Sequence, residues 1–87
     1  MYRIYLRDAE QRVSDKTVTG DPGVALAAFA ALVNRADLDG SKLLAVLNRD
    51  GRPVAHHDFQ IRPDGSPIDP MKWWRDRLDQ IDLSKSA

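Results

Sequence analysis

The residues best suited to chemistry in this chain are three neighbours, His56, His57 and Asp58. A histidine near an aspartate can act in general acid–base catalysis, and both residue types bind metal ions. Adjacent residues of a strand point to opposite faces, so His56 and His57 cannot readily bind one metal, and no third ligand is evident nearby. We therefore expect no metal and no cofactor, and the simpler interpretation is a pair of solvated or core-edge histidines.

The chain contains few other groups that could serve in catalysis. It has no cysteine, which excludes a thiol nucleophile, a disulfide framework and a thiolate zinc site. The serines are expected in loops, at sheet edges or in the tail: Ser14, Ser41, Ser66, Ser84 and Ser86. We expect a protein that is not an enzyme and has no catalytic residues. The alternative is a small toxin-type ribonuclease that uses His56 or His57.

A basic and aromatic stripe lies on the first predicted strand, which runs from Tyr2 to Asp8. Apolar and polar residues alternate along it, which predicts one buried and one exposed set of side chains. The core-facing set is Tyr2, Ile4 and Leu6, and the solvent-facing set is Arg3, Tyr5 and Arg7. Arginine and tyrosine can stack bases, bind phosphates or anchor a protein partner. Arg3, Tyr5 and Arg7 are thus candidate partner-binding residues, and a merely solvated sheet face is the alternative.

A second candidate site lies at the neighbouring residues Trp73 and Trp74. A helix turns about 100° per residue, so both indoles cannot occupy the centre of one face. Trp74 belongs to the apolar stripe of a predicted second helix, formed by Met71, Trp74, Leu78 and Ile81. Trp73 lies off this stripe beside Arg77, and both types are common interface hot spots. Trp73 and Arg77 are therefore candidate partner-binding residues, unless Trp73 only covers the edge of the core.

These candidates need a scaffold, and its centre is the predicted helix over residues 21–35, DPGVALAAFAALVNR. Asp21 is a suitable N-cap, and Pro22 suits the first helical position. The face predicted to be buried carries Leu26, Phe29, Leu32 and Val33, flanked by Ala25 and Ala36. The outer face is free of charge and carries Ala27, Ala31 and Asn34. Such a face permits close approach of another helix or of a second copy, so a homodimer is possible.

Three further strands complete the predicted sheet. The segment 13–19 contains few apolar residues and is typical of an edge strand. The segment 42–48 is apolar on both faces and is typical of an inner strand. Asp50-Gly51 predicts a tight hairpin turn, after which residues 54–61 form the last strand.

Both halves of the chain follow the same order of strand, turn, strand, Asp-Pro and helix. This is either a weak internal ββα repeat or a coincidence between two hairpins. In both cases the expected fold class is α+β, a two-layer ββαββα sandwich with a four-stranded, mainly antiparallel sheet and two helices on one face. We expect one domain over residues 1–83 and a frayed tail over residues 84–87.

The composition limits the range of partners. Thirteen basic and thirteen acidic residues balance among 87, which argues against a broad surface for nucleic acid or anionic membranes. The longest apolar run, residues 24–33, is too short and too rich in alanine to span a bilayer. The first residues lack the apolar core of a signal peptide. We expect a cytoplasmic protein without a membrane partner.

The chain resembles the small orphan α/β proteins of bacterial phages and mobile elements, among them the anti-CRISPR inhibitors. The resemblance rests on small size, a neutral cysteine-free composition, and the segments YRIYLRD, DPGVALAAFAALV and LNRDGRPVAHHDF with a closing WW helix. It implies binding and blocking of a protein complex without a cofactor, and no site residue is carried over. We expect a small protein-binding module that inhibits a larger bacterial complex. A nucleic-acid-binding domain that uses the exposed sheet face is the alternative.

Overall fold

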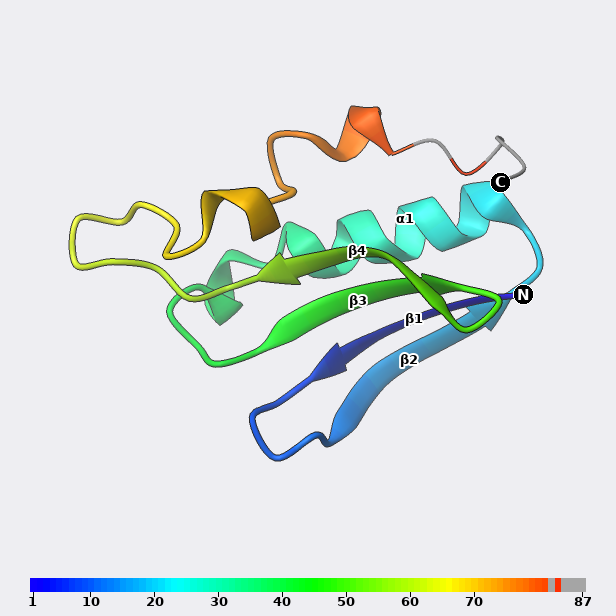
Figure 1. Cartoon of the computed structure of the whole chain (residues 1–87), viewed down its shortest axis with the longest axis horizontal. Helices are drawn as coiled ribbons and strands as arrows, with labels where there is room; N and C mark the ends of the chain where they lie inside the picture. The colour runs from blue at the N-terminus through cyan, green and yellow to red at the C-terminus, as the bar shows by residue number, and fades with distance from the viewer. Residues whose placement is uncertain (82, 84–87) are drawn as a thin grey trace.

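The strands of the computed structural model, which describes residues 1–81 and Leu83, form one antiparallel sheet in the order β2-β1-β3-β4 (Figure 1). Their bounds are β1 Tyr2–Arg7, β2 Val13–Thr19, β3 Leu44–Arg49 and β4 Arg52–Asp58. The two-sided apolar strand β3 is an inner strand and the polar strand β2 is an edge strand, as predicted. The α+β class and the four-stranded antiparallel sheet are therefore confirmed.

The helix α1 (Pro22–Val33) begins at the predicted residue. The Asp21 carboxylate accepts hydrogen bonds from the amides of Gly23 at 2.7 Å and Val24 at 3.2 Å, and Pro22 occupies the first helical position. Its buried residues are Ala25, Phe29, Leu32 and Val33, with Leu26 packed beside them. The helix ends at Val33, a little earlier than predicted, and Ala36 is therefore exposed in a short 3-10 turn.

The β3–β4 hairpin has the tight turn that its sequence predicts. Asp50 has a φ of 51° and Gly51 a φ of 81°, so both central residues lie in the left-handed region. The Asp50 carboxylate also accepts a hydrogen bond from the amino group of Met1 at 2.6 Å. This ion pair joins the turn to the beginning of β1.

The prediction of a second α-helix is wrong. The C-terminal segment, which we define as residues 69–81 and Leu83, has two 3-10 turns, η2 (Pro70–Lys72) and η3 (Leu78–Gln80). Between them the chain is extended at Trp73 and then turns, with the Arg77 amide donating to the Trp74 carbonyl at 2.9 Å. In an α-helix the Trp74 amide would donate to the Pro70 carbonyl. Here it donates to Nδ1 of His57 at 2.9 Å, and the Pro70 carbonyl accepts from the Arg77 guanidinium. Side-chain hydrogen bonds and tighter backbone bonds, such as that from the Trp73 amide to the Pro70 carbonyl at 3.3 Å, thus replace those of an α-helix.

Because the segment does not form an α-helix, only part of the predicted apolar stripe is buried. Ile81 is buried, and Trp74 and Leu78 are partly buried, whereas the Met71 side chain is 77% exposed. The ββαββα order is therefore shown only as far as ββαββ, followed by two 3-10 turns. A ββα repeat is correspondingly incomplete in its second half.

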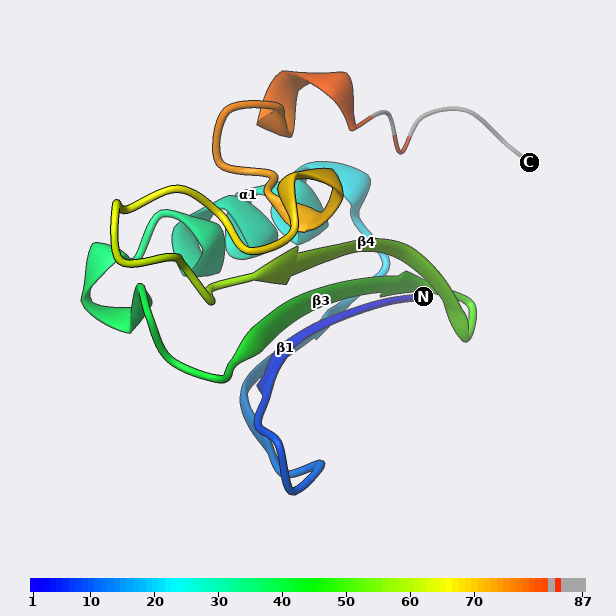
Figure 2. The ribbon, with the colours of Figure 1, turned by 60° about the vertical axis from the view of Figure 1, so that its left-hand side comes forward.

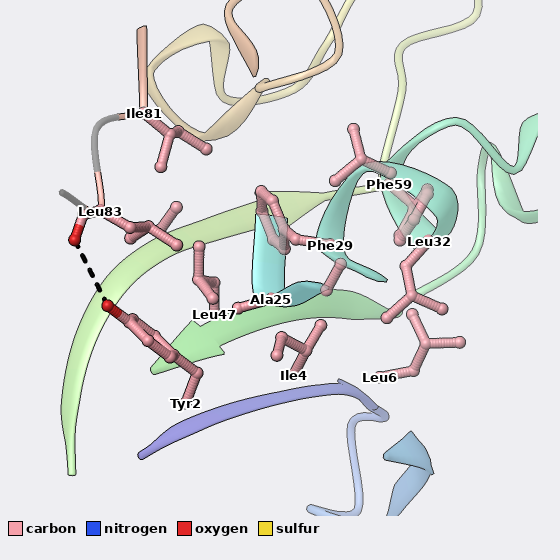
Figure 3. Packing of buried hydrophobic residues seen from close by; sticks show 13 residues of the cluster. Tyr2, Ile4, Leu6, Ala25, Phe29, Leu32, Leu47, Phe59, Ile81 and Leu83 are labelled. Carbon is pink, nitrogen blue, oxygen red and sulfur yellow. Dashed lines mark hydrogen bonds between the residues drawn. The ribbon is translucent and has the colours of Figure 1, made fainter. Parts of the chain in front are cut away.

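The core lies between the sheet on one side and α1 with the C-terminal segment on the other (Figure 2). Phe29 of α1 belongs to one cluster with Ile4 of β1, Leu47 of β3, Phe59 directly after β4, and Ile81 of the C-terminal segment (Figure 3). The Tyr2 hydroxyl donates to the Leu83 carbonyl at 3.3 Å, which joins the end of the described chain to its first strand. The predicted tail, residues 84–87, lies outside the described residues.

Truncation of Phe29 tests this assignment of the core. Phe29→Ala should lower the free energy of unfolding by about 3–5 kcal/mol, because it leaves a cavity at a fully buried position. Val24→Ala, on the same helix at a half-exposed position, should cost less than about 1 kcal/mol. Urea denaturation of both variants makes the comparison. Equal costs would contradict the assigned buried face.

Gly51 allows a separate test of the hairpin turn. An added Cβ would meet no atom within 4 Å, so Gly51→Ala should be destabilising only through its φ of 81°, by about 1–2 kcal/mol. Gly20 is the matched control, because its added Cβ also meets open space and its φ lies outside the left-handed region. Denaturant midpoints should fall for Gly51→Ala and stay near the wild-type value for Gly20→Ala. The reverse order would refute the turn assignment.

Candidate partner-binding face

The sheet face turned away from α1 has no described segment across it (Figures 1 and 2). Cross-strand partners share a face, so the registers define which side chains it carries. One row crosses the sheet as Val13, Arg7, Leu44 and Asp58, a second as Tyr5, Val46 and His56, and a third as Val18, Arg3 and Asn48. We call these residues, together with Val54 of β4, the open face.

The predicted residues Arg3, Tyr5 and Arg7 thus lie together along the middle of the open face. Val46 stands next to Tyr5 in the register and is only 1% exposed, although it does not belong to the core cluster. Its neighbours on the open face therefore cover it. The Tyr5 hydroxyl accepts a hydrogen bond from the Asn48 amide at 3.2 Å, which fixes the ring above the sheet. The centre of the open face is an ordered, packed surface.

Aliphatic side chains flank this centre on both edge strands. Val13 and Val18 of β2 are 51% and 50% exposed, and Val54 of β4 is 37% exposed. A sheet face that only met water would carry polar residues at such positions. The open face therefore combines arginine, tyrosine and exposed valine, a combination typical of protein interfaces.

The arginines fall into two groups according to their contacts. Arg35 pairs with Asp15 and Asp37, and Arg75 pairs with Asp39, so these guanidinium groups are bound within the chain. Arg3 and Arg7 make no hydrogen bond or ion pair with any residue that the structure describes. Their charges on the open face are available to another molecule.

His56 lies close to two positively charged side chains. Its pKa is lowered by partial burial and then by the nearby cations of Arg7 and Lys72. Lys72 belongs to η2, which packs beside β4. The alternation along β4 puts His56 on the open face, but the sequence alone did not indicate that Lys72 lies near it.

His57 points to the opposite face and has a structural position. It is fully buried, and its Nδ1 accepts the Trp74 amide. The ring packs edge-on against Phe59 and lies 4.6 Å from the Trp73 ring, while Nε2 has no hydrogen-bond partner among the described residues. Burial, followed by the positive charge of Arg75, lowers its pKa to about 4. His57 is therefore neutral near pH 7 and has no surface for a substrate to reach.

The predicted pair Trp73 and Arg77 lies away from the open face. The half-buried Trp73 ring contacts His57 and carries the Arg75 guanidinium 4.9 Å from its centroid. Arg77 stacks over Trp74 instead and donates to the carbonyls of Pro70, Met71 and Trp73. These contacts favour the alternative interpretation of Trp73 as a boundary residue, and they occupy Arg77 within its own segment.

The contacts of Arg75 attach the C-terminal segment to the end of α1. Its guanidinium bonds both Asp39 oxygens, at 2.7 and 3.0 Å, and its Nε donates to the Val33 carbonyl at 3.0 Å. The hydrogen bond and charge of Asp39 raise the Arg75 pKa further. A bidentate pair of this kind adds directional specificity to charge attraction.

The described residues contain no group of three His, Asp or Glu side chains placed to hold a metal ion. His56 and His57 lie on opposite faces of β4, as the alternation predicts. No helix in the described ranges is long and apolar enough to cross a bilayer. Comparisons of the sequence with protein-family models and curated proteins, and of the chain with solved structures, found no match.

The buried His57 predicts a specific dependence of stability on pH. Its pKa falls from 6.5 to about 4 on folding, so the unfolded state binds more protons between these values. Stability from this group is complete above pH 6.5 and is lost as the pH falls toward 4, by about 2–3 kcal/mol. His57→Gln should remove this extra loss, whereas His56→Gln should retain most of it. Urea titrations across the window measure it, and parallel curves for wild type and His57→Gln would contradict it.

Proposed function

We propose that the chain is a non-enzymatic protein-binding module that docks a partner protein on its open face. The observation that carries the proposal is the position of Arg3 and Arg7, unpaired among the described residues, on either side of Tyr5 on an uncovered sheet face. Arginine and tyrosine are common interface anchors because each offers a large contact area together with polar groups. The ordered surface around Val46 supports this use, since little rearrangement is needed on binding.

Exposed valines favour a protein partner over a nucleic acid. Phosphate backbones are bound by clustered lysine and arginine, and single-stranded bases are bound by several stacked aromatic rings. The open face has one tyrosine, and Val13, Val18 and Val54 lie where further basic or aromatic residues would be needed. An apolar protein surface with acidic groups would bury these valines and pair with the arginines.

The resemblance to phage-borne inhibitors extends the proposal to the consequence of binding. The bound protein would be a component of a larger bacterial complex, and occupation of its surface would block that complex. This extension rests on the resemblance alone and has a separate test. Adding the chain to the purified complex should inhibit its activity in a one-to-one ratio with the captured component.

Substitution on the open face tests the proposed interface. Tagged wild-type chain is used to capture its partner from a lysate of the native host, and binding to the purified partner is then titrated. Arg3→Glu and Arg7→Glu should each weaken binding by about 2 kcal/mol or more, about 30-fold in Kd. Both positions lie at the surface, so melting curves should remain close to that of wild type.

Two controls make the result specific to the open face. Arg62→Glu makes the same charge change at an exposed loop residue and should leave Kd within about 2-fold. Ala27→Glu alters the outer face of α1, which is the other surface suited to close approach. Loss of binding in Ala27→Glu but not in Arg3→Glu would move the interface to α1. A steep fall in affinity with salt and capture of nucleic acid would favour the alternative function.

A further inference from the structure

Two neighbouring hollows lie beside the open face and share Lys72. The charged hollow, of about 240 Å³, lies where β1 ends and β3 begins, and its charged lining is Arg7, Lys42, Lys72, Asp8 and Asp58. The apolar hollow, of about 270 Å³, lies between β4 and η2, and its lining includes Val54, Met71, Trp74 and Lys72. Because Lys72 borders both, a single short segment can reach the two hollows together.

The charged hollow has an excess of positive charge. Neither Arg7 nor the two lysines forms an ion pair with any described residue, while both carboxylates are already engaged by the backbone. Oδ1 of Asp8 accepts the amides of Glu10 and Arg12, and Oδ1 of Asp58 accepts the amide of Gln60. Arg7 and Lys72 also lie near His56, whose pKa is lowered first by burial and then by these two cations.

Large apolar side chains are exposed to solvent in the apolar hollow. Met71 is 77% exposed and Val54 is 37% exposed, and they line it from η2 and β4. The Trp74 side chain forms part of its wall and is stacked under the Arg77 guanidinium, 4.6 Å from the ring centroid. This stacking holds the wall of the hollow in place without a bound partner.

We infer that the partner engages this corner of the module with a short acidic-apolar segment, its carboxylate held among Arg7, Lys42 and Lys72 and its apolar side chain seated against Val54, Met71 and Trp74. The inference rests on the proposed function and adds the chemistry of the partner. Carboxylates pair with arginine and lysine through charge-assisted hydrogen bonds, which supply orientation as well as attraction. The valine, methionine and tryptophan surfaces supply the apolar burial that such a contact needs.

The test is a titration of the isotopically labelled chain, followed by amide NMR shifts, with a capped peptide that alternates glutamate and leucine. The peptide should move the amides of Arg7, Lys42 and Lys72 together with those of Val54 and Met71. Lys72→Glu should weaken its binding by about 5-fold or more, because this residue borders both hollows. Arg62→Glu should leave the affinity unchanged within about 2-fold.

Comparison probes separate the possible causes of a shift. A capped lysine-leucine peptide should not move these amides, and equal binding of it would overturn the inference, since acidity would then be irrelevant. Inorganic phosphate that produced the same shifts at the same affinity would also overturn it, because the corner would be a general anion site. Failure of the acidic peptide while Arg3→Glu still abolishes partner binding would refute this inference and leave the proposed function intact. Peptide binding without any effect of Arg3→Glu on the partner would refute the proposed function instead.

Discussion

A four-stranded sheet is about 15 Å wide across its strands, whereas a helix with its side chains is about 10–12 Å wide, and this difference governs how the chain closes its core. α1 lies mainly over β1, β2 and β3, so the β4 side of the same face needs another cover. The C-terminal segment supplies it, with Ile81 and Leu83 in the core. Its Trp74 amide bonds the His57 side chain and its Arg75 guanidinium bonds Asp39, which attaches the segment to β4 and to the chain that follows α1.

The parts of the fold that sequence predicts correctly are those controlled by neighbours in the chain. The Asp21 cap, the alternation along β1 and the Asp50-Gly51 turn each act over a few residues, and each is present as predicted. The C-terminal segment is controlled from a distance instead. Its Trp74 amide bonds a residue 17 positions earlier, and Arg75 bonds a carbonyl 42 positions earlier. A stripe of apolar residues at helical spacing cannot reveal partners of this kind, because these partners lie far away in the sequence.

The residues of the candidate site also differ in whether local or distant parts of the chain determine their position. Alternation alone is sufficient to place Arg3, Tyr5 and Arg7 on one exposed face, since it needs no knowledge of other strands. The neighbours of these residues follow only from strand order and register, which is why the sequence did not associate Val46 or Lys72 with them. Trp73 and Arg77 would share an exposed surface only on a second α-helix, which does not form. In the segment as observed, the Trp73 ring packs against His57 of β4, and Arg77 donates to carbonyls of its own segment.

A balance of thirteen basic and thirteen acidic residues fixes the total charge but not its distribution. The ion pairs of the described residues join Arg35 to Asp15 and Asp37, Arg75 to Asp39, and the amino group of Met1 to Asp50. These pairs engage carboxylates within the chain and leave Arg3 and Arg7 without an ionic partner among the described residues. The open face therefore retains positive charge that the total conceals. A chain that is neutral as a whole can in this way present a surface suited to an acidic partner, without the high net charge that would attract nucleic acids indiscriminately.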